Sequence, residues 1–359
     1  MNVLWQLIIT ALAALFGAAS TEAWKHRREL SDRVRRFLTK DWGPRKRGQV
    51  TLAVGVAAIL AVALWGEVLS QRWQETSIEP KPEMVTDGYI WITYEPSDFD
   101  PNTGQEPSLE SIERELGWIS EADFTGIITF TSRGVFSAIP ELASREGLAV
   151  IMGVWDPNDK GEVDAAISKR EYVVGYTVGH NHLNDRDGGY SFEQLNTAMK
   201  RIRSKTGRPV STTARRGAYS RDKRLLTVGD WVFPDAHVRI QGDNLDLPAD
   251  ALRDVDLTIE MAKDIAEQEE RGNIPILLNL VTYAVGGVSN ATQLEQAAFF
   301  AAIFEARIDD SLPAIAVHSS FDTPWKTGRF FYDWDPFTGL FEFDGTPRPA
   351  VKEIMDRSR

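Results

Sequence analysis

Histidine, aromatic and acidic side chains recur at the ends of predicted apolar strands in residues 88–359. Four of the five histidines fall at such ends. The residues that we group as a candidate ligand cleft are Trp155, Asp156, His180, His182, His237, Tyr283, His318, Asp322 and Trp325. Imidazole and carboxylate groups bind metals or move protons, and aromatic rings either stack on a ligand or pack at a rim.

Two histidines have a spacing that suits a metal. His180 and His182 flank a single residue, and imidazole is a common zinc ligand. Hydrogen bonding within a cleft explains the same residues without a metal, and we expect neither a metal nor a cofactor. The chain has no cysteine, which excludes disulfides, thiol nucleophiles and thiolate metal sites.

Three aspartates are the carboxylates that remain at predicted strand ends: Asp156, Asp235 and Asp322. Salt bridges or loop caps are one explanation. A rewired pair of catalytic acids is the other, because glycoside hydrolysis uses two carboxyl groups. No glycine-rich phosphate-binding motif accompanies these residues, so the sequence gives no support to nucleotide binding.

The elements that position these residues alternate between apolar strands and helices. Strands are predicted at 88–94, 126–131, 148–155, 173–178, 209–213, 231–237, 274–280 and 314–319. Helices are predicted at 108–121, 138–146, 161–169, 192–205, 251–271 and 291–307. The pattern predicts an α/β fold, a (β/α)8 TIM-type barrel over residues 88–359, with an open doubly wound sheet as the alternative. Active sites of such barrels lie at the C-terminal strand ends.

Residues 1–70 differ from the rest of the chain in charge and hydropathy. The stretches 1–21 and 48–66 carry no charged side chain, and residues 24–48 hold ten basic and three acidic side chains. We therefore expect a transmembrane helical hairpin: a helix over about 2–23, a cytoplasmic loop over 24–48 and a helix over 49–68. A cleaved signal peptide is the alternative, although a basic n-region is missing. Residues 71–87 are predicted to be a linker.

This topology gives the chain a location and partners. The positive-inside rule predicts a two-pass protein of the bacterial inner (cytoplasmic) membrane, with its large C-terminal domain on the periplasmic side. We expect membrane lipid and other membrane proteins as partners. Residues 71–359 hold 30 basic and 47 acidic side chains, and such an acidic domain argues against binding of nucleic acid.

Short stretches along residues 88–352 resemble the bacterial family 17 glycoside hydrolases, (β/α)8 enzymes that act on β-1,3-glucans. The matching stretches are Ala138–Pro140 with Gly147–Leu148, Val173–Gly179, Thr206–Val210, Gly229–Pro234, Phe321–Asp322 with Pro324–Lys326, Gly339–Phe341 and Asp344–Pro347. The resemblance implies a barrel of this kind and β-glucan as a candidate ligand.

The catalytic glutamates of that family have no counterpart in this chain. The family's acid/base glutamate ends a Val-Gly-Asn-Glu pattern after the fourth strand, where this sequence has Asn181. Its nucleophile ends the seventh strand, where Leu280 stands. A retaining glycosidase needs two carboxyl groups about 5–5.5 Å apart, so the resemblance implies a glycoside-hydrolase-like barrel that is catalytically inactive. Together with the predicted anchor, we expect a membrane-anchored subunit with a structural or interaction role in a membrane complex. A glucan-binding module, or an active hydrolase or transglycosylase with displaced catalytic groups, stays as an alternative.

Overall fold

The computed structural model describes residues 81–180, 183, 189–236, 240–241, 244–245, 248–268, 274–289, 291–308, 313–328 and 331–358. All of them belong to one unit, Thr76–Arg359. The predicted membrane anchor and the first part of the predicted linker lie outside the described residues. No helix among the described residues is long and apolar enough to cross a bilayer.

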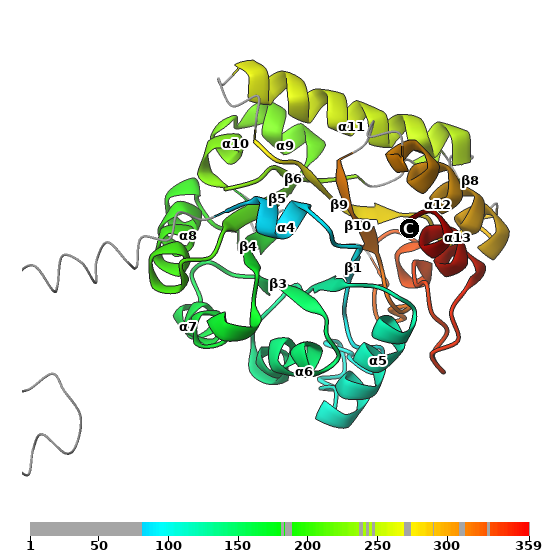
Figure 1. Cartoon of the computed structure of the whole chain (residues 1–359), viewed down its shortest axis with the longest axis horizontal. Helices are drawn as coiled ribbons and strands as arrows, with labels where there is room; N and C mark the ends of the chain where they lie inside the picture. Colours follow the sequence, from blue (N-terminus) through cyan, green and yellow to red (C-terminus); the bar gives the residue numbers. More distant parts are fainter. Residues whose placement is uncertain are drawn as a thin grey trace, which may run out of the picture. The chain divides into compact units, whose positions relative to one another are not determined.

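Eight parallel strands close into a barrel (Figure 1). They are β1 (Trp91–Thr93), β2 (Gly126–Ile128), β3 (Ala149–Val154), β4 (Gly175–His180), β5 (Val210–Arg215), β6 (Phe233–Asp235), β9 (Leu277–Thr282) and β10 (Ala314–His318). Each strand pairs with the next one along the barrel, and β1 closes the ring by pairing with β10. The predicted (β/α)8 barrel is confirmed, and the open-sheet alternative is wrong.

Helices surround the barrel on its outside (Figure 1). They are α5 (Leu109–Glu121), α6 (Ile139–Arg145), α7 (Lys160–Ser168), α8 (Phe192–Thr206), α9 (Arg216–Arg221), α10 (Arg224–Val228), α11 (Pro248–Gln268), α12 (Gln293–Ile308) and α13 (Pro349–Ser358). Local sequence sets several boundaries. The hydroxyl of Ser108 caps α5, Ser191 and Gln194 form a capping box at α8, and Gly207 ends α8 with a φ of 67°.

Shorter elements connect the main ones. The 3-10 helices are η1 (Gly134–Ala138), η2 (Arg170–Tyr172) and η3 (Asp335–Phe337). A small antiparallel hairpin of β7 (Ile240–Gln241) and β8 (Asn244–Leu245) lies between β6 and α11. The segment between β10 and α13 contains η3 and supplies several residues of the candidate site described below.

The apolar core has two layers. A large outer layer fills the space between strands and helices, and a smaller one fills the inside of the barrel, with Trp91, Ile128, Trp231 and Phe233 among its members. Inside the barrel the strands must leave room for the indoles. A side chain at Gly126 would place its Cβ 2.4 Å from the ring of Trp91, so glycine is required there.

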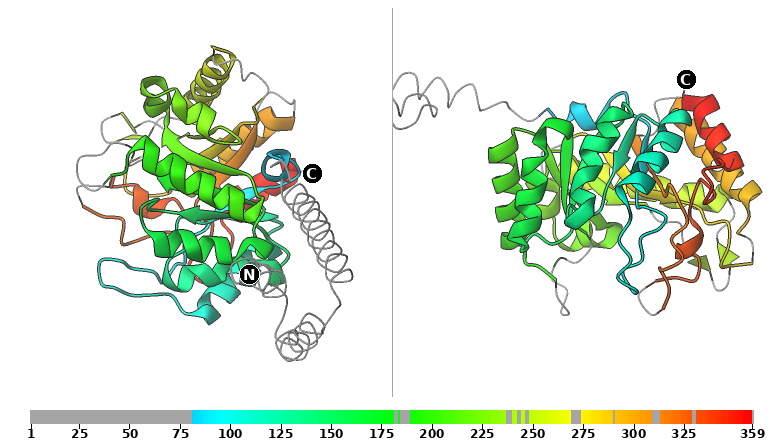
Figure 2. Two further views of the ribbon diagram at one scale, coloured as in Figure 1. Left: turned by 90° about the vertical axis from the view of Figure 1, so that its left-hand side faces the viewer. Right: turned by 90° about the horizontal axis from the view of Figure 1, so that it is seen from below.

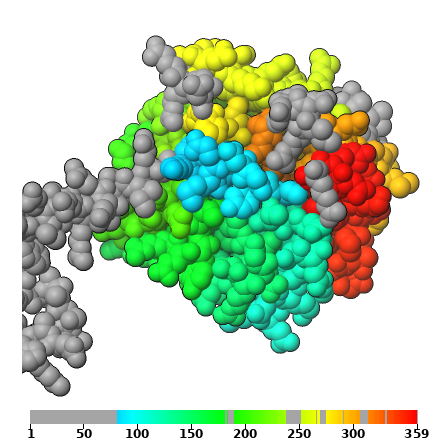
Figure 3. Space-filling model, viewed as in Figure 1, coloured from blue at the N-terminus to red at the C-terminus, as the bar shows by residue number. Residues whose placement is uncertain are grey.

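One end of the barrel is closed by the helix α4 (Glu83–Thr86), which lies over the middle of this face in Figures 1 and 3. Its Val85 is fully buried in the inner core, and the carbonyl of Val85 accepts a hydrogen bond of 2.8 Å from the indole of Trp91. The ordered barrel unit therefore includes residues that the sequence assigned to the linker. The loops after β1 and β10 lie at the opposite end (Figure 2), which is the mouth.

Candidate ligand-binding site

Three predicted site residues meet at the barrel mouth. The imidazole of His180, at the end of β4, stacks on the indole of Trp155, with ring centroids 5.0 Å apart and planes inclined by 24°. The ring of Phe130 stands edge-on to His180 at 5.6 Å and to His318 at 6.1 Å. His318 ends β10, and its Nδ1 shares a hydrogen bond of 2.7 Å with the hydroxyl of Thr93.

The position of Trp155 is set by a buried carboxylate on α7. Glu162 accepts hydrogen bonds from the backbone N–H groups of Trp155 (2.8 Å) and Asp156 (3.1 Å) and from the hydroxyl of Thr131 (2.6 Å). The guanidinium of Arg133 lies 3.2 Å from the same carboxylate and 3.6 Å from the carboxylate of Asp156. The charge of Glu162 therefore holds the end of β3, while Asp156 is occupied with Arg133.

Buried polar side chains lie on β5, β6 and β9, the strands that follow β4 around the barrel. Asp235, at the end of β6, accepts hydrogen bonds from the hydroxyl of Thr213 (2.5 Å) and the side-chain amide of Asn279 (2.9 Å). Thr213, Asp235 and Asn279 therefore join β5, β6 and β9 through one group of hydrogen-bonded side chains. Oδ1 of Asn279 and the hydroxyls of Thr177 and Thr282 are buried and have no hydrogen-bond partner within the described structure.

A buried ion pair borders this site, and sequence reasoning missed both of its members. Nζ of Lys326 lies 2.8 Å from Oε2 of Glu95, and the two side chains are 12% and 11% exposed. The same Nζ lies 5.7 Å from the ring centre of Phe130 and 5.4 Å from that of Trp325, within range of cation–π attraction. Glu95 could have been found from its place just after the first predicted strand.

Tyr283 does not line the mouth, in contrast to the sequence-based expectation. It is fully buried, and its ring packs on Phe299 of α12 with centroids 5.3 Å apart. The cause is an irregular register between β9 and β10, where Leu280 adopts a φ of 51°. An extra residue at this point reverses the alternation of the strand, so Tyr283 turns toward the helices.

The remaining predicted site residues lie either in the segment after β10 or outside the described residues. Asp322 forms a two-point ion pair with Arg348, at 2.7 and 3.1 Å. Trp325 packs edge-on against Phe99, with centroids 5.9 Å apart. Both belong to the segment after β10, and neither takes part in the Trp155–His180 stack. Asn181, His182 and His237 lie outside the described residues.

Strand β9 carries no carboxylate side chain. Leu280 lies within that strand, and its side chain is 3% exposed. Four carboxylates that the structure describes at this end of the barrel have partners: Glu95 has Lys326, Asp156 has Arg133, Asp235 has two hydrogen-bond donors and Asp322 has Arg348. Over the described part of the chain, no group of three or more His, Asp or Glu side chains could hold a metal ion.

A further buried acid lies behind the loop that follows β1. Glu115 of α5 accepts hydrogen bonds from the hydroxyls of Tyr94 (2.9 Å) and Ser97 (2.5 Å). Burial raises the pKa of Glu115 above its ordinary value, and the neighbouring carboxylate of Asp98 adds to this shift. Burial also raises the pKa of Tyr94 well above its usual range. These groups support the loop and do not face the stacked pair.

Comparison with known proteins identifies the fold. No family model and no curated protein matches the sequence. An endo-laminarinase from Formosa superposes with a TM-score of 0.58 at 14% identity, over 75% of this chain and 87% of that chain. A family 5 glycoside hydrolase from Bifidobacterium longum, in complex with Manβ1-4GlcNAc, gives 0.55 at 16% identity, over 75% and 77%. A β-glucuronidase from Ruminococcus gnavus gives 0.52 at 12% identity, over 76% and 50%. The chain therefore has the TIM-type barrel fold of glycoside hydrolases.

Proposed function

We propose that this chain is a glycoside-hydrolase-like barrel that binds at its mouth without cleaving glycosides, and that it serves as an interaction subunit at the outer face of a bacterial inner membrane. The partnering of these four carboxylates carries the proposal. A retaining glycosidase needs one carboxyl group that donates a proton and another that attacks the sugar. Glu95 and Asp322 are instead each bound to a cation, and Leu280 replaces the inherited nucleophile.

A specific observation favours glycan binding as the second candidate function. Polar side chains of Thr213, Asp235 and Asn279 meet at β5, β6 and β9, and sugar hydroxyls both donate and accept hydrogen bonds. The indole of Trp155, held by Glu162 and by the His180 ring, supplies an apolar surface at the same end of the barrel. The endo-laminarinase and glucuronidase neighbours support a saccharide, and β-glucan is the first ligand to test.

The membrane location rests on the sequence. The two uncharged stretches and the basic loop of residues 1–70 support a two-pass anchor. A barrel tethered in this way would meet periplasmic glycans and the extracytoplasmic parts of other membrane proteins. Lipid and membrane proteins are therefore the partners that we propose, and nucleic acid is not among them.

The proposal is tested with the purified full-length chain in mild detergent and laminarihexaose. We expect no shorter or transglycosylated products above those of a protein-free control. Turnover that survives purification and disappears in Glu95→Gln or Asp235→Asn would overturn the non-catalytic function. Binding of the hexasaccharide, measured calorimetrically, and its loss in Trp155→Ala would establish the glycan-binding candidate. Co-purification of defined membrane proteins without saccharide binding would support the interaction role alone.

A further inference from the structure

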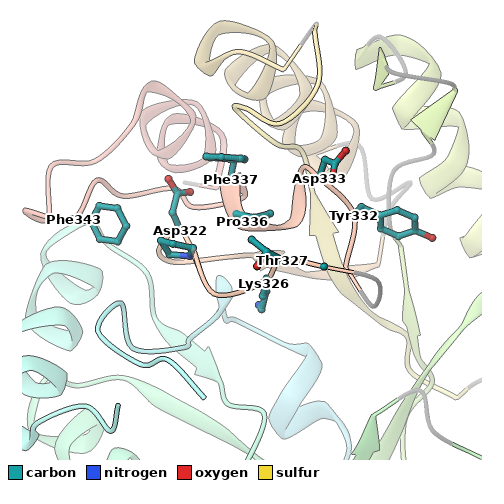
Figure 4. Close-up of a pocket in the computed structure, with 10 residues that line it drawn as sticks. Asp322, Lys326, Thr327, Tyr332, Asp333, Pro336, Phe337 and Phe343 are labelled. Atoms are coloured by element: carbon teal, nitrogen blue, oxygen red, sulfur yellow. The ribbon is translucent and has the colours of Figure 1, made fainter. Parts of the chain in front are cut away.

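A cavity of about 250 Å³ lies beside the mouth, between the segment after β10 and the turn that precedes α13 (Figure 4). Its lining includes Tyr332, Phe337 and Phe343 together with Asp322, Lys326 and Asp333. Tyr332 and Phe343 lie at opposite ends of the lining, with Phe337 between them (Figure 4). Ordinary small-molecule pockets measure about 300–1,000 Å³, so this cavity suits one ring rather than a long chain.

Exposed aromatic side chains converge on this cavity. Seven large apolar side chains are exposed among the described residues, and three of them line it. Tyr332 is 56% exposed, Phe343 is 54% exposed and Phe337 is 40% exposed. Clustered exposed apolar groups mark binding surfaces more often than single ones do.

The aromatic rings are held in place by their surroundings. The ring of Tyr332 stacks on the buried Trp334, with centroids 5.5 Å apart and planes inclined by 3°. The backbone N–H of Tyr332 donates to the carboxylate of Asp335 at 2.8 Å. One face of the phenol is therefore fixed against protein while the ring stays largely exposed. A surface that is already rigid loses little conformational entropy when a ligand binds.

The backbone that carries the other two aromatic residues is constrained by close packing at glycine. Phe343 stands on a tight turn that is closed by a hydrogen bond of 2.9 Å from Gly345 N–H to the carbonyl of Glu342. Gly345 has a φ of 86° and packs directly on Trp118, where a Cβ would come within 2.2 Å of the indole. Phe337 rests on Gly286, where a Cβ would lie 3.0 Å from its ring.

The charges around the cavity argue against an anionic ligand. Lys326 is already paired with Glu95, and the carboxylate of Asp322 is paired with Arg348. Asp333 adds an exposed carboxylate to the lining, and the hydroxyl of Thr327 adds a neutral group. Carboxylates and hydroxyls accept hydrogen bonds from a neutral ligand rich in O–H groups.

From these observations we infer that the cavity is a second binding site, separate from the barrel mouth, for one pyranose unit of a neutral oligosaccharide. The apolar C–H face of the sugar packs within the aromatic lining, where Phe337 lies between Tyr332 and Phe343 (Figure 4). Its hydroxyl groups donate to the carboxylates of Asp333 and Asp322. The site does not depend on the mouth, because none of its aromatic residues takes part in the Trp155–His180 stack.

The experiment uses the full-length chain in lipid nanodiscs, with laminaritriose and cellotriose as probes and trigalacturonic acid as the anionic control. Binding is followed by saturation-transfer NMR and by titration calorimetry. Tyr332→Ala and Phe343→Ala should each weaken binding of at least one neutral probe about tenfold. Tyr172→Ala removes an aromatic ring that is 37% exposed on η2 and should leave the affinity unchanged.

A site at the barrel mouth gives a different pattern of results. Loss of all binding in Trp155→Ala, with unchanged binding in the Tyr332→Ala/Phe343→Ala double variant, would overturn this inference and leave the proposed glycan-binding function intact. Binding of neither neutral probe, or equal binding of trigalacturonic acid, would also overturn it. Binding that persists in Trp155→Ala and falls in the double variant supports the second site, whatever the mouth itself binds.

Discussion

Nζ of Lys326 and Oε2 of Glu95 lie 2.8 Å apart between the two candidate sites of this barrel. Glu95 follows β1, and Lys326 belongs to the segment after β10. The ammonium group also faces the rings of Phe130 and Trp325. The ion pair therefore links the aromatic side of the mouth to the segment that forms the cavity of Tyr332 and Phe343. Loss of the pair should destabilise both the mouth and this segment.

Replacement of Lys326 by methionine should destabilise the barrel. The change leaves the carboxylate of Glu95 buried without its cation, and breaking a buried pair from one side costs about 3 kcal/mol. Lys352→Met is the matched control, since its pair with Asp356 is exposed at 76% and 58% and solvent screens such a pair strongly. Urea unfolding of the full chain, followed by near-ultraviolet circular dichroism, measures both. Equal effects of the two changes would contradict the importance of the pair.

Glu115 should make stability depend on pH. Burial raises its pKa in the folded state above the ordinary 4.5, so the folded chain holds this proton over a range where the unfolded chain has released it. The contribution of Glu115 is therefore fully present below about pH 4.5 and is lost as pH rises through the raised pKa.

The matched variant for this prediction is Glu115→Gln, which has the same shape and does not titrate. The free energy of unfolding of the natural chain, minus that of the variant, should fall as pH rises from 4 to 8. The measurement is urea unfolding at a series of pH values. A difference that stays constant or grows with pH would show that the carboxyl group is not held in its protonated form.

The predicted topology can be tested independently of the fold. The loop over residues 24–48 has ten basic and three acidic side chains, so it should remain cytoplasmic, with both chain ends outside. Protease added to intact spheroplasts should digest the barrel domain. Protection of the domain until the membrane is broken would show that the orientation is reversed, while a cytoplasmic marker protein controls for leakage.

Local sequence patterns were sufficient to predict the barrel, because most of its strands are continuous apolar runs that alternate with helices. The helix predicted over 108–121 is α5, which begins directly after its cap Ser108. Helix α4 was not predicted, since residues 71–87 contain Pro80 and Pro82 and few large apolar side chains. Val85 is ordered by a contact with the inside of the barrel, and no local pattern reveals such a distant contact.

The site was only partly predictable from the sequence. The rule that ligands bind at C-terminal strand ends brought Trp155, His180 and His318 into one group, as the structure has them. The prediction for Tyr283 was wrong because the irregularity at Leu280 reverses which face of the strand points into the barrel. A prediction from regular alternation does not include such a reversal. The cavity aromatics were missed for another reason: their exposure depends on how the segment between β10 and α13 folds back.

Restoring a carboxylate at position 280 should cost stability without creating a hydrolase. The side chain of Leu280 is 3% exposed, and a charged carboxylate is strongly disfavoured in such surroundings. Leu280→Glu should therefore be less stable than the neutral, equally polar Leu280→Gln at pH 7, with a gap of about 2 kcal/mol or more. The gap in stability should close as pH falls, because protonation removes the charge.

Leu280→Met tests the loss of shape alone and should cost less than about 1.5 kcal/mol. Urea unfolding at pH 5 and pH 7 measures these differences, and a laminarihexaose assay at both values should show no products. A Leu280→Glu chain that is as stable as Leu280→Gln at pH 7 would mean that this position is hydrated, and hydrolysis by it would mean that the barrel needs only one carboxylate to regain the glycosidase reaction.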